Sequence, residues 1–306
     1  MSPVEADLYE ELRPRAFGLA YRMLGSVSEA EDVVQEGLLR LHRALDAGEA
    51  IASPAAYLST VVTRLAIDEL RSARARRETY VGEWLPEPLL TGEEEDPARD
   101  AEMADSLSMA LLLVLETLTP EQRAVFLLRE VFDYPFREIA EVVAKSEGAV
   151  RQLAVRARRQ VGEGGRDFAP SRAQREELTE SFLAATLDGD LEVLEALLAA
   201  DVVLHGDGGG KAPALARPLH GSRRAAKTLA AWGRLVVKIG ATMRPAEVNG
   251  QPGAVVFAAD GGVISVLVLD VTGGRIQAIR GIVNPDKLRH IGRVADLGEL
   301  TRRARA

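Results

Sequence analysis

His205 and Asp207 are the residues of this sequence whose types and spacing best suit acid–base chemistry. They lie two positions apart in the run "DVVLHGDGGGK", so both side chains would share one face if this stretch is a strand. An imidazole and a carboxylate inside a cavity can transfer a proton to or from a substrate. Asp270, in the run "VISVLVLDV", has a carboxylate but no evident partner. The pair leaves an acid–base enzyme open as one alternative.

The glycine-rich stretch from Asp207 to Lys211 could cradle a phosphate, but it does not match a P-loop. Its spacing differs from that of a P-loop, and no Ser or Thr follows Lys211. The three glycines, Gly208, Gly209 and Gly210, instead predict a loop whose bare backbone lets another segment approach closely. We expect Lys211 to meet a carboxylate there, in the acidic segment that precedes residue 105. The sequence has no cysteine, which excludes thiolate zinc sites and cysteine nucleophiles; no metal and no cofactor is expected.

Two basic segments could bind the phosphates of nucleic acid. The first holds Arg64, Arg71, Arg74, Arg76 and Arg77, and the second holds Lys145 with Arg151, Arg156, Arg158 and Arg159. The segment between them, from residue 93 to residue 105, carries seven acidic residues. The net charge of −8 argues against a protein that coats nucleic acid indiscriminately. The pattern therefore favours local, selective contacts with DNA.

Residues 1–78 are expected to form a helical domain. Ser28 with Glu31 predicts a capping box, and Ser53 followed by Pro54 predicts another helix start. In the helix from residue 29 to residue 45, apolar residues recur at spacings of three and four. The opposite face carries a polar set around one apolar residue: Asp32, Gln35, Glu36, Leu39 and Arg40. Such a face is either a solvated surface or a polar interface with an apolar anchor.

Residues 79–104 predict a linker, and residues 105–165 a second helical domain. Thr119 followed by Pro120 and Gln122 predicts a capping box, and Ser146 caps a basic helix. A connection of about three residues joins this helix to the one before it, which fits a helix-turn-helix or an ordinary helical hairpin. In the first case, Arg151 is placed to reach a base edge, and Arg156, Arg158 and Arg159 to contact the DNA backbone.

Residues 173–293 predict an α+β domain, followed by a tail over residues 294–306. Helices are expected near 174–187, 190–199 and 222–235, and strands near 235–247, 253–259, 263–271 and 275–283. Turn signals such as Asn249-Gly250 separate these strands, so the sequence predicts an antiparallel meander. The fold class is thus multidomain: two all-α domains followed by an α+β domain.

These motifs together resemble an extracytoplasmic-function sigma factor, a subunit that directs bacterial RNA polymerase to promoters. "DVVQEGLLRL" and "YLSTVVTRLAIDELRSARARR" look like sigma region 2, and the helix-turn-helix looks like sigma region 4. "WLPEP", "DGGGK" and "NPDKL" match the subgroup with a fused, cone-shaped SnoaL-like domain. The recognition helix lacks the histidine often found before the final basic cluster.

The resemblance implies a role for each set of residues. Binding of core polymerase falls to Asp32, Gln35, Glu36, Leu39 and Arg40. Contacts with the minus-10 element fall to Arg64, Arg71, Arg74, Arg76 and Arg77. Contacts with the minus-35 element fall to Ser146, Glu147, Val150, Arg151, Arg156, Arg158 and Arg159. Regulatory contacts fall to the three motifs: Trp84, Leu85, Pro86, Glu87 and Pro88; Asp207, Gly208, Gly209, Gly210 and Lys211; and Asn284, Pro285, Asp286, Lys287 and Leu288.

The predicted function is that of a non-enzymatic sigma factor regulated in cis by its C-terminal domain. Its expected partners are core RNA polymerase and promoter DNA, with no membrane and no separate anti-sigma factor, and its expected location is the cytoplasm. The prolines would keep the linker extended, and the ring of Trp84 would pack on the C-terminal domain near Gly208 to Gly210. Alternatives are a SnoaL-like enzyme, or a small-molecule sensor that binds an unknown ligand in the C-terminal domain and is fused to a DNA-binding module. A simple repressor would leave the Asp32 face and the first basic segment without a purpose.

Overall fold

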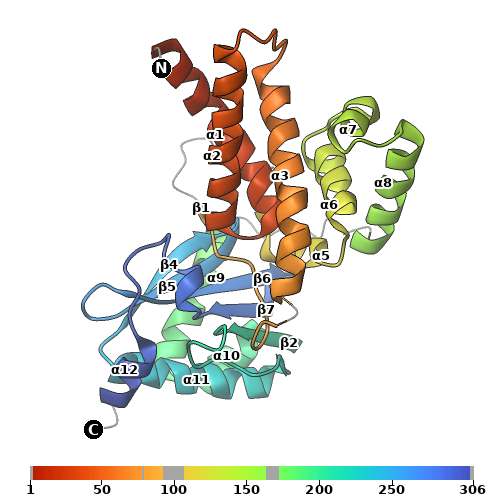
Figure 1. Ribbon diagram of the computed structural model, residues 1–306. Coiled ribbons are helices and arrows are strands. Elements are labelled where there is room, and N and C mark those ends of the chain that lie inside the picture. Colours follow the sequence, from red (N-terminus) through yellow and green to blue (C-terminus); the bar gives the residue numbers. More distant parts are fainter. Residues whose placement is uncertain (1–2, 78, 92–106, 163–171, 304–306) are drawn as a thin grey trace. The chain divides into compact units, whose positions relative to one another are not determined.

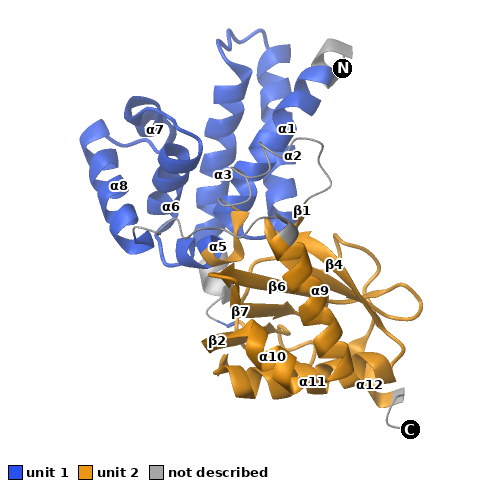
Figure 2. Cartoon of the chain, turned by 180° about the vertical axis from the view of Figure 1, so that it is seen from behind, with its two compact units in different colours: residues 1–79, 111–164 blue, residues 80–110, 165–306 orange. Residues whose placement is uncertain are grey.

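The computed structural model describes residues 3–77, 79–91, 107–162 and 172–303, and it divides the chain into two compact units (Figures 1 and 2). Unit 1 comprises residues 1–79 and 111–164, and unit 2 comprises residues 80–110 and 165–306. The segment expected to link the two helical domains is therefore grouped with the C-terminal domain. We call the described residues 80–91 the docking segment.

Unit 1 begins with three long helices, α1 (Pro3–Leu24), α2 (Val27–Asp46) and α3 (Pro54–Arg77), which pack on one another. The cap of α2 differs from the predicted one. Ser26, not Ser28, is the N-cap, and its hydroxyl accepts a hydrogen bond from the Glu29 amide at 3.2 Å. Gly25 ends α1 with φ of 67°, a conformation that glycine adopts without steric cost, so the chain is already extended at Ser26. The predicted Ser53 cap of α3 is confirmed.

The rest of unit 1 consists of α5 (Met109–Leu115), α6 (Pro120–Phe126), a π-helical turn η1 (Leu127–Val131), α7 (Phe136–Val142) and α8 (Glu147–Val161). The predicted capping box of Thr119 with Gln122 and the Ser146 cap of α8 are both confirmed. Three residues separate the end of α7 at Val142 from Ser146, the N-cap of α8. One of them, Ala144, has the left-handed φ of 52° that turns the chain. Helices α7 and α8 therefore form the predicted helix-turn-helix.

Unit 2 contains a seven-stranded sheet in the order β1-β4-β5-β6-β7-β2-β3. The strands are β1 (Leu90–Thr91), β2 (Leu198–Asp207), β3 (Leu219–His220), β4 (Thr242–Val248), β5 (Gln251–Phe257), β6 (Val263–Thr272) and β7 (Arg275–Ile282). The predicted meander is confirmed, because β4 to β7 pair antiparallel in sequence order. Strand β2 is parallel to β7. The first meander strand begins later than predicted, since the preceding helix continues through Lys238.

Helices α9 (Arg172–Asp188), α10 (Leu191–Leu197) and α11 (Ser222–Lys238) belong to unit 2, together with the 3-10 turn η2 (Pro285–Lys287) and helix α12 (Leu297–Arg303). The first three helices share an apolar core with one face of the sheet, which we call the cone face. Leu204 on β2, Leu269 on β6 and Ile279 on β7 are buried in that core. This arrangement is an α+β domain of the predicted class.

The opposite face of the sheet, which we call the linker face, carries charged side chains. His205 on β2 is in register with Arg280 on β7, which is in register with Val268 on β6. Residues in register on neighbouring strands lie on the same face, and successive residues alternate between faces. The linker face therefore carries four charged or titratable side chains, opposite the face that α9, α10 and α11 cover: His205, Asp207, Asp270 and Arg280.

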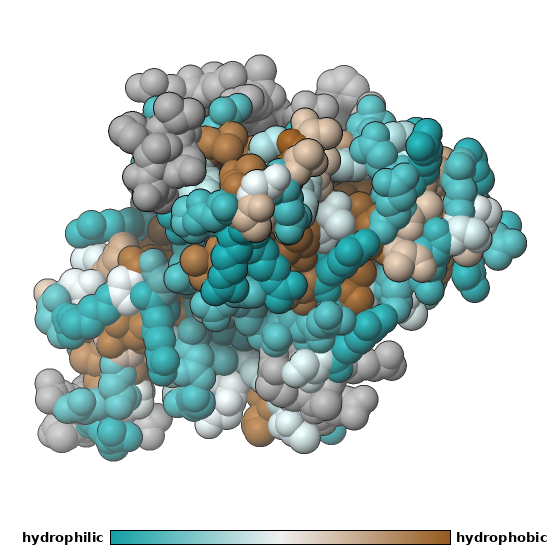
Figure 3. Space-filling model, turned by 45° about the horizontal axis from the view of Figure 1, so that its top comes forward, coloured by the Kyte–Doolittle hydropathy of each residue, from teal (hydrophilic) through white to brown (hydrophobic). Residues whose placement is uncertain are grey.

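The surface is largely hydrophilic on the face shown in Figure 3, where hydrophobic residues are visible only between polar ones. Within the described ranges, no helix is long and apolar enough to cross a membrane. The same ranges contain no group of three or more His, Asp or Glu side chains that could hold a metal ion.

Candidate functional site

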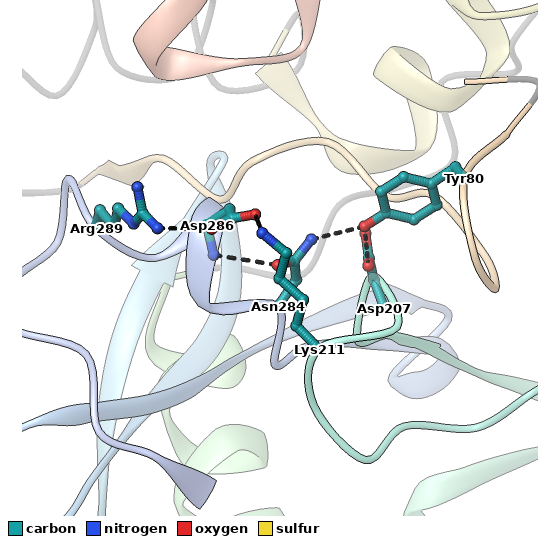
Figure 4. A network of polar contacts seen from close by, with 6 residues as sticks. All are labelled: Tyr80, Asp207, Lys211, Asn284, Asp286 and Arg289. Carbon is teal, nitrogen blue, oxygen red and sulfur yellow. Dashed lines mark hydrogen bonds and ion pairs between the residues drawn. The ribbon is translucent and has the colours of Figure 1, made fainter. Parts of the chain in front are cut away.

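Asp207 is the centre of a polar network that holds the docking segment within unit 2 (Figure 4). Its carboxylate is fully buried. It accepts hydrogen bonds from the Tyr80 hydroxyl at 2.5 Å, from the Leu85 backbone amide at 2.9 Å and from the Lys287 ammonium at 2.7 Å. The Asn284 side-chain amide donates to the Tyr80 hydroxyl at 2.8 Å. The three motifs of the sequence thus meet at one carboxylate.

Lys287 contributes charge and cation–π contacts to the same network. Its ammonium donates to the Leu85 carbonyl as well as to Asp207, and it lies 4.9 Å from the Tyr80 ring centroid and 4.3 Å from that of Trp84. Burial, with the hydrogen bond to Asp207, raises the pKa of the Tyr80 phenol well above its usual value. Tyr80 therefore stays a neutral donor, as the bond to Asp207 requires.

The glycine loop approaches the docking segment closely, as its bare backbone predicts. Gly209 and Gly210 have φ of +57° and +70°, and a Cβ on Gly209 would lie 2.3 Å from the Asn284 amide nitrogen and 2.9 Å from the Tyr80 hydroxyl. A Cβ on Gly210 would lie 3.1 Å from that of Val81. A side chain at Gly209 would displace the network.

Lys211 meets a carboxylate as predicted, but not the expected one. Lys211 pairs with Asp286 rather than with an acidic residue of the linker, because the turn η2 places that carboxylate beside the loop. Asp286 also pairs with Arg289 at 2.8 Å. The atoms nearest to a Cβ at Gly209 belong to Asn284 and Tyr80, and those nearest to a Cβ at Gly210 belong to Val81. The Trp84 ring lies over the Lys287 ammonium of the same unit, and its packing near Gly208 to Gly210 stays a prediction.

Most residues of the WLPEP and NPDKL motifs are buried. Leu85 and Leu288 are fully buried, and Pro86, Glu87 and Pro88 are also classed as buried. The His290 ring contacts the Pro88 carbonyl at 2.7 Å. The acidic residues between positions 92 and 106 lie outside the described residues.

Asn249 fixes the docking segment at a second point. It is buried with φ of 54°. Its side chain accepts from the Leu89 amide at 3.0 Å and donates to the Leu107 carbonyl at 3.1 Å, and its own amide donates to the Leu89 carbonyl at 2.8 Å. Strand β1 then pairs antiparallel with β4, with Leu90 opposite Val248. One side chain thus binds residues on both sides of positions 92–106.

The side chains considered for acid–base chemistry are engaged on the linker face. His205 Nδ1 lies 2.7 Å from a Glu83 carboxylate oxygen, Asp270 pairs with Arg280, and Asp207 binds the docking segment. None of these groups lines the apolar cavity that lies on the cone face. The arrangement supplies contacts for a peptide segment and does not place an acid–base pair beside a substrate cavity.

Sequence reasoning missed Tyr80, Glu83 and Asn249. Tyr80 and Glu83 precede the WLPEP motif, and a polar aromatic residue beside a tryptophan in a linker was the signal that could have found Tyr80. Asn249 was interpreted only as a turn residue. Asn249 and Gly250 both have the positive φ of the turn, 54° and 68°, and the Asn249 side chain binds the docking segment as well.

In unit 1, the polar face of α2 lies at the surface. Asp32 and Gln35 are exposed, Glu36 forms an ion pair with Arg40 at 2.8 Å, and Leu39 keeps 43% of its surface exposed. An exposed leucine among alternating charges is a suitable anchor for a protein interface.

Two arginines of the first basic segment contact α6 and α7 within unit 1. Arg64 donates to the backbone carbonyls of Glu141 and Val142, each at 2.9 Å, at the end of α7. Arg71 pairs with Glu121 at 2.7 Å, and hydrogen bonding to Glu121 raises the pKa of Arg71. Arg74, Arg76 and Arg77 lie in the last turns of α3, and their side chains lie outside the described residues.

Buried polar contacts also join the first three helices of unit 1 to its later elements. Arg123 on α6 is buried and donates to the carbonyls of Met23 and Leu115 and to the Glu116 carboxylate. Burial lowers its pKa to about 9. The Tyr134 hydroxyl donates to Ser59 of α3 at 2.9 Å. The two helical domains therefore form one compact unit.

Helix α8 exposes most of the residues expected to contact DNA. Arg151, Arg156, Arg158 and Arg159 are exposed. The Arg151 guanidinium lies 4.5 Å from the Phe136 ring centroid and pairs with Glu147 at 2.5 Å. The prediction that Val150 contacts DNA is wrong. Val150 is fully buried, because it lies on the side of α8 that packs on the rest of the domain. It is unavailable for DNA contact.

Comparisons with known proteins agree with this geometry. The family model described as "Sigma-70 region 2" matches residues 8–76, and "Sigma-70, region 4" matches residues 108–161. The chain is 38% identical over 301 residues to "ECF RNA polymerase sigma factor SigJ" of Mycobacterium tuberculosis (strain ATCC 25618 / H37Rv), with 93% of each chain covered. The chain belongs to the extracytoplasmic-function sigma factors.

Two further similarities cover most of this sigma factor. "Probable ECF RNA polymerase sigma factor SigI" of Mycobacterium tuberculosis (strain CDC 1551 / Oshkosh) is 33% identical over 274 residues, which is 88% of this chain and 90% of the relative. The crystal structure of Mycobacterium tuberculosis SigJ superposes with a TM-score of 0.72 at 36% identity, covering 93% of this chain and 98% of that one.

The family resemblance and the fold class predicted from the motifs are thereby confirmed. As a sigma factor, the protein directs transcription initiation at specific promoters, and it is not an enzyme. Regions 2 and 4 are the parts through which sigma factors bind core RNA polymerase and promoter DNA. The α+β domain of unit 2 is the fused SnoaL-like domain.

Proposed function

We propose that the SnoaL-like domain regulates this sigma factor in cis, by holding the segment that connects regions 2 and 4. The main support for this proposal is that the buried Asp207 carboxylate binds Tyr80, the Leu85 amide and Lys287. A contact within one chain needs no separate anti-sigma factor. The regulated form is the cytoplasmic sigma subunit, before or during its assembly with core polymerase.

The lengths involved support a restraint. The two promoter elements lie at separate places along the DNA, so the segment between regions 2 and 4 must be able to extend. Residues 80–110 number 31, and an extended chain of that length reaches about 100 Å. Held at Asp207 and again at Asn249, which binds both Leu89 and Leu107, the segment loses much of that reach. Release from the domain would restore it.

The contacts within unit 1 also support an inhibitory role for the compact state. Arg64 and Arg71, assigned here to the minus-10 element, are engaged by α7 and by Glu121 of α6. Each guanidinium uses two of its five N–H donors in these contacts, which hold both side chains against the helices of region 4. We infer that the compact unit 1 is the inactive form and that separation of regions 2 and 4 is the activating step.

The surface residues retain the roles that the family implies. The α2 face of Asp32, Gln35, Glu36, Leu39 and Arg40 binds core polymerase. The exposed arginines of α8 contact the minus-35 element, with Arg151 at a base edge and Arg156, Arg158 and Arg159 on phosphates. Arg74, Arg76 and Arg77 extend the minus-10 surface of α3.

Run-off transcription with core polymerase tests the regulatory proposal. Leu85→Ala combined with Tyr80→Phe removes a fully buried side chain and one donor to Asp207 while leaving the sigma domains and the sheet unchanged. We expect transcript yield to rise several-fold, and residues 80–91 to exchange amide hydrogens faster. Leu90→Ala is the control, because Leu90 is exposed and pairs through its backbone.

Two results would refute the restraint. If exchange accelerates but transcript yield stays constant, docking has no regulatory effect. If transcription is lost although the variant still binds core polymerase, docking is an activating contact instead of an inhibitory one.

A further inference from the structure

The SnoaL-like domain contains an apolar cavity of about 450 Å³ on the cone face. It lies between the sheet, α11 and the C-terminal helix α12, all within unit 2. Gly206 on β2, Gly281 on β7 and Leu267 on β6 form one row across the sheet, and all three line the cavity. Gly281 leaves space where a side chain would otherwise fill the sheet surface, whereas Gly206 lets the Leu215 backbone approach closely, since a Cβ at Gly206 would lie 3.0 Å from the Leu215 nitrogen. The volume falls in the range of sites for drug-sized molecules.

The lining determines the class of ligand. The apolar lining includes Leu215, Trp232, Ile239, Met243 and Val256. Polar side chains are few among the described lining residues: Ser265, which is buried, and Thr301 and Arg302 of α12, which are more accessible. Arg302 supplies the positive charge at the α12 side. A mainly apolar pocket with one polar end is typical of a site for an amphiphilic molecule.

We propose that this cavity binds a hydrocarbon carboxylate, with its apolar body against the sheet and α11 and its carboxylate toward Arg302. The guanidinium is the group best suited to a carboxylate, since it offers paired donors in a planar fork. The Ser265 hydroxyl adds a donor from β6, whereas the Thr301 hydroxyl already donates to the Leu297 carbonyl. A neutral hydrocarbon would gain the same apolar contacts but not the charged one.

The cavity and the docking network share their walls. Gly206 lines the cavity while its neighbour Asp207 binds the docking segment on the other face, and Val283 and Asn284 repeat this arrangement. The glycine loop continues from the network into Pro213, Ala214 and Leu215, which line the cavity. A bound ligand that shifts this loop changes the surface offered to the docking segment. This second part rests on the proposed function, whereas ligand binding itself does not.

Binding is tested with 11-(dansylamino)undecanoic acid and the full chain carrying Trp84→Phe. Trp232 is then the one indole of the chain, and it lines the cavity, so energy transfer from Trp232 to the dansyl group reports occupancy. We expect saturable transfer. Arg302→Gln should weaken binding of the acid by about tenfold, the lower end of the range for a hydrogen bond to a charged group. It should leave binding of the probe's methyl ester unchanged.

Gly281→Leu is the occluding variant. A Cβ at Gly281 meets only ordinary contacts, with Leu267 at 3.5 Å, and the longer side chain then occupies the cavity. Ala231→Leu, at an exposed position of α11, is the matched control. Ser265→Leu is a second occluding variant in case Gly281→Leu does not fold, as judged by circular dichroism.

The outcomes separate the two parts of the proposal. Loss of transfer in the occluded variant but not in the control supports the site, and equal transfer in both overturns it. Equal affinity of the wild-type cavity for the acid and for its methyl ester refutes the carboxylate assignment. If the acid binds but amide exchange in residues 80–91 of the wild-type chain is unchanged at saturation, coupling fails while the ligand site stands. Failure of the cis regulation itself would appear separately, in the transcription assay of the docking variants.

Discussion

Two lysines of unit 2 provide a matched test of the docking network. Lys287 and Lys211 each pair with an aspartate, but their side chains are 8% and 56% exposed. Replacing Lys287 by Met keeps the length of the side chain and removes the cation, which leaves the buried Asp207 carboxylate without a counter-ion. Replacing Lys211 by Met removes an ion pair that water already solvates.

The expected magnitudes differ several-fold. Breaking one partner of a buried ion pair costs about 3–5 kcal/mol, because the remaining charge stays buried. Lost cation–π contacts with Tyr80 and Trp84 add about 1–2 kcal/mol. An exposed pair such as Lys211 with Asp286 contributes about 0–1 kcal/mol. The loss of stability caused by Lys287→Met cannot exceed the free energy of docking. Once the docking segment leaves, water can solvate the Asp207 carboxylate.

The assay follows Trp84 emission during thermal unfolding, in a Trp232→Phe background. For a domain of this size, 3–5 kcal/mol corresponds to a fall in Tm of about 6–20 °C, against less than about 4 °C for Lys211→Met. If undocking comes first, Trp84 emission is already shifted to the red at 25 °C and the amide of Leu85 exchanges rapidly. Equal shifts in Tm for the two lysines would refute the assignment of Lys287 as the buried counter-ion, and so would a Lys287→Met variant whose Tm and emission spectrum are both unchanged.

Three further predictions concern other surfaces. Asp32→Ala with Glu36→Ala should abolish co-elution with core polymerase while the helical circular dichroism spectrum stays intact; retained co-elution would contradict the α2 interface. Arg151→Ala should cost about 1–3 kcal/mol of promoter binding and relax specificity at one base of the minus-35 element, whereas equal weakening on all sequences would make Arg151 a phosphate contact. Because the pKa of Tyr80 is raised, its contribution to docking is complete below the unfolded phenol pKa of about 10 and is lost as pH rises through the folded value. Trp84 emission should therefore be constant from pH 6 to 10, and Tyr80→Phe should abolish the alkaline change; a transition near neutral pH would contradict this.

The helical part of the fold could be predicted because its signals are local. A Thr or Ser cap followed by proline or by Gln at the right spacing specifies a helix start within four residues, as at Ser53 and Thr119. The Ser26 cap was missed because Ser28 offers the same chemistry two residues later, and only the backbone conformation after Gly25 distinguishes them. The meander was predictable from its turn dipeptides. The parallel pairing of β2 with β7 was not, since no local pattern records it.

The candidate site was only partly predictable, for a similar reason. The motifs indicated that the linker meets the glycine loop, but the partner of each charge depends on tertiary geometry. Lys211 and Lys287 are equally cationic in sequence, and only the turn η2 decides that one meets Asp286 at the surface and the other Asp207 in the interior. The cavity could not be predicted, because Gly206 and Gly281 become neighbours only through the pairing of β2 with β7.

Strand β1 has a consequence for the handling of this protein in solution. It is the outermost strand of the sheet and covers only the end of β4, opposite Glu247 and Val248. When the docking segment leaves, those backbone groups become an open sheet edge, the kind of template on which chains associate. Pro245 within β4 lacks an amide hydrogen and limits how far such pairing can extend. Variants that favour release should therefore self-associate more readily at high concentration, and a short peptide with the sequence of residues 84–91 should suppress this association by occupying the edge.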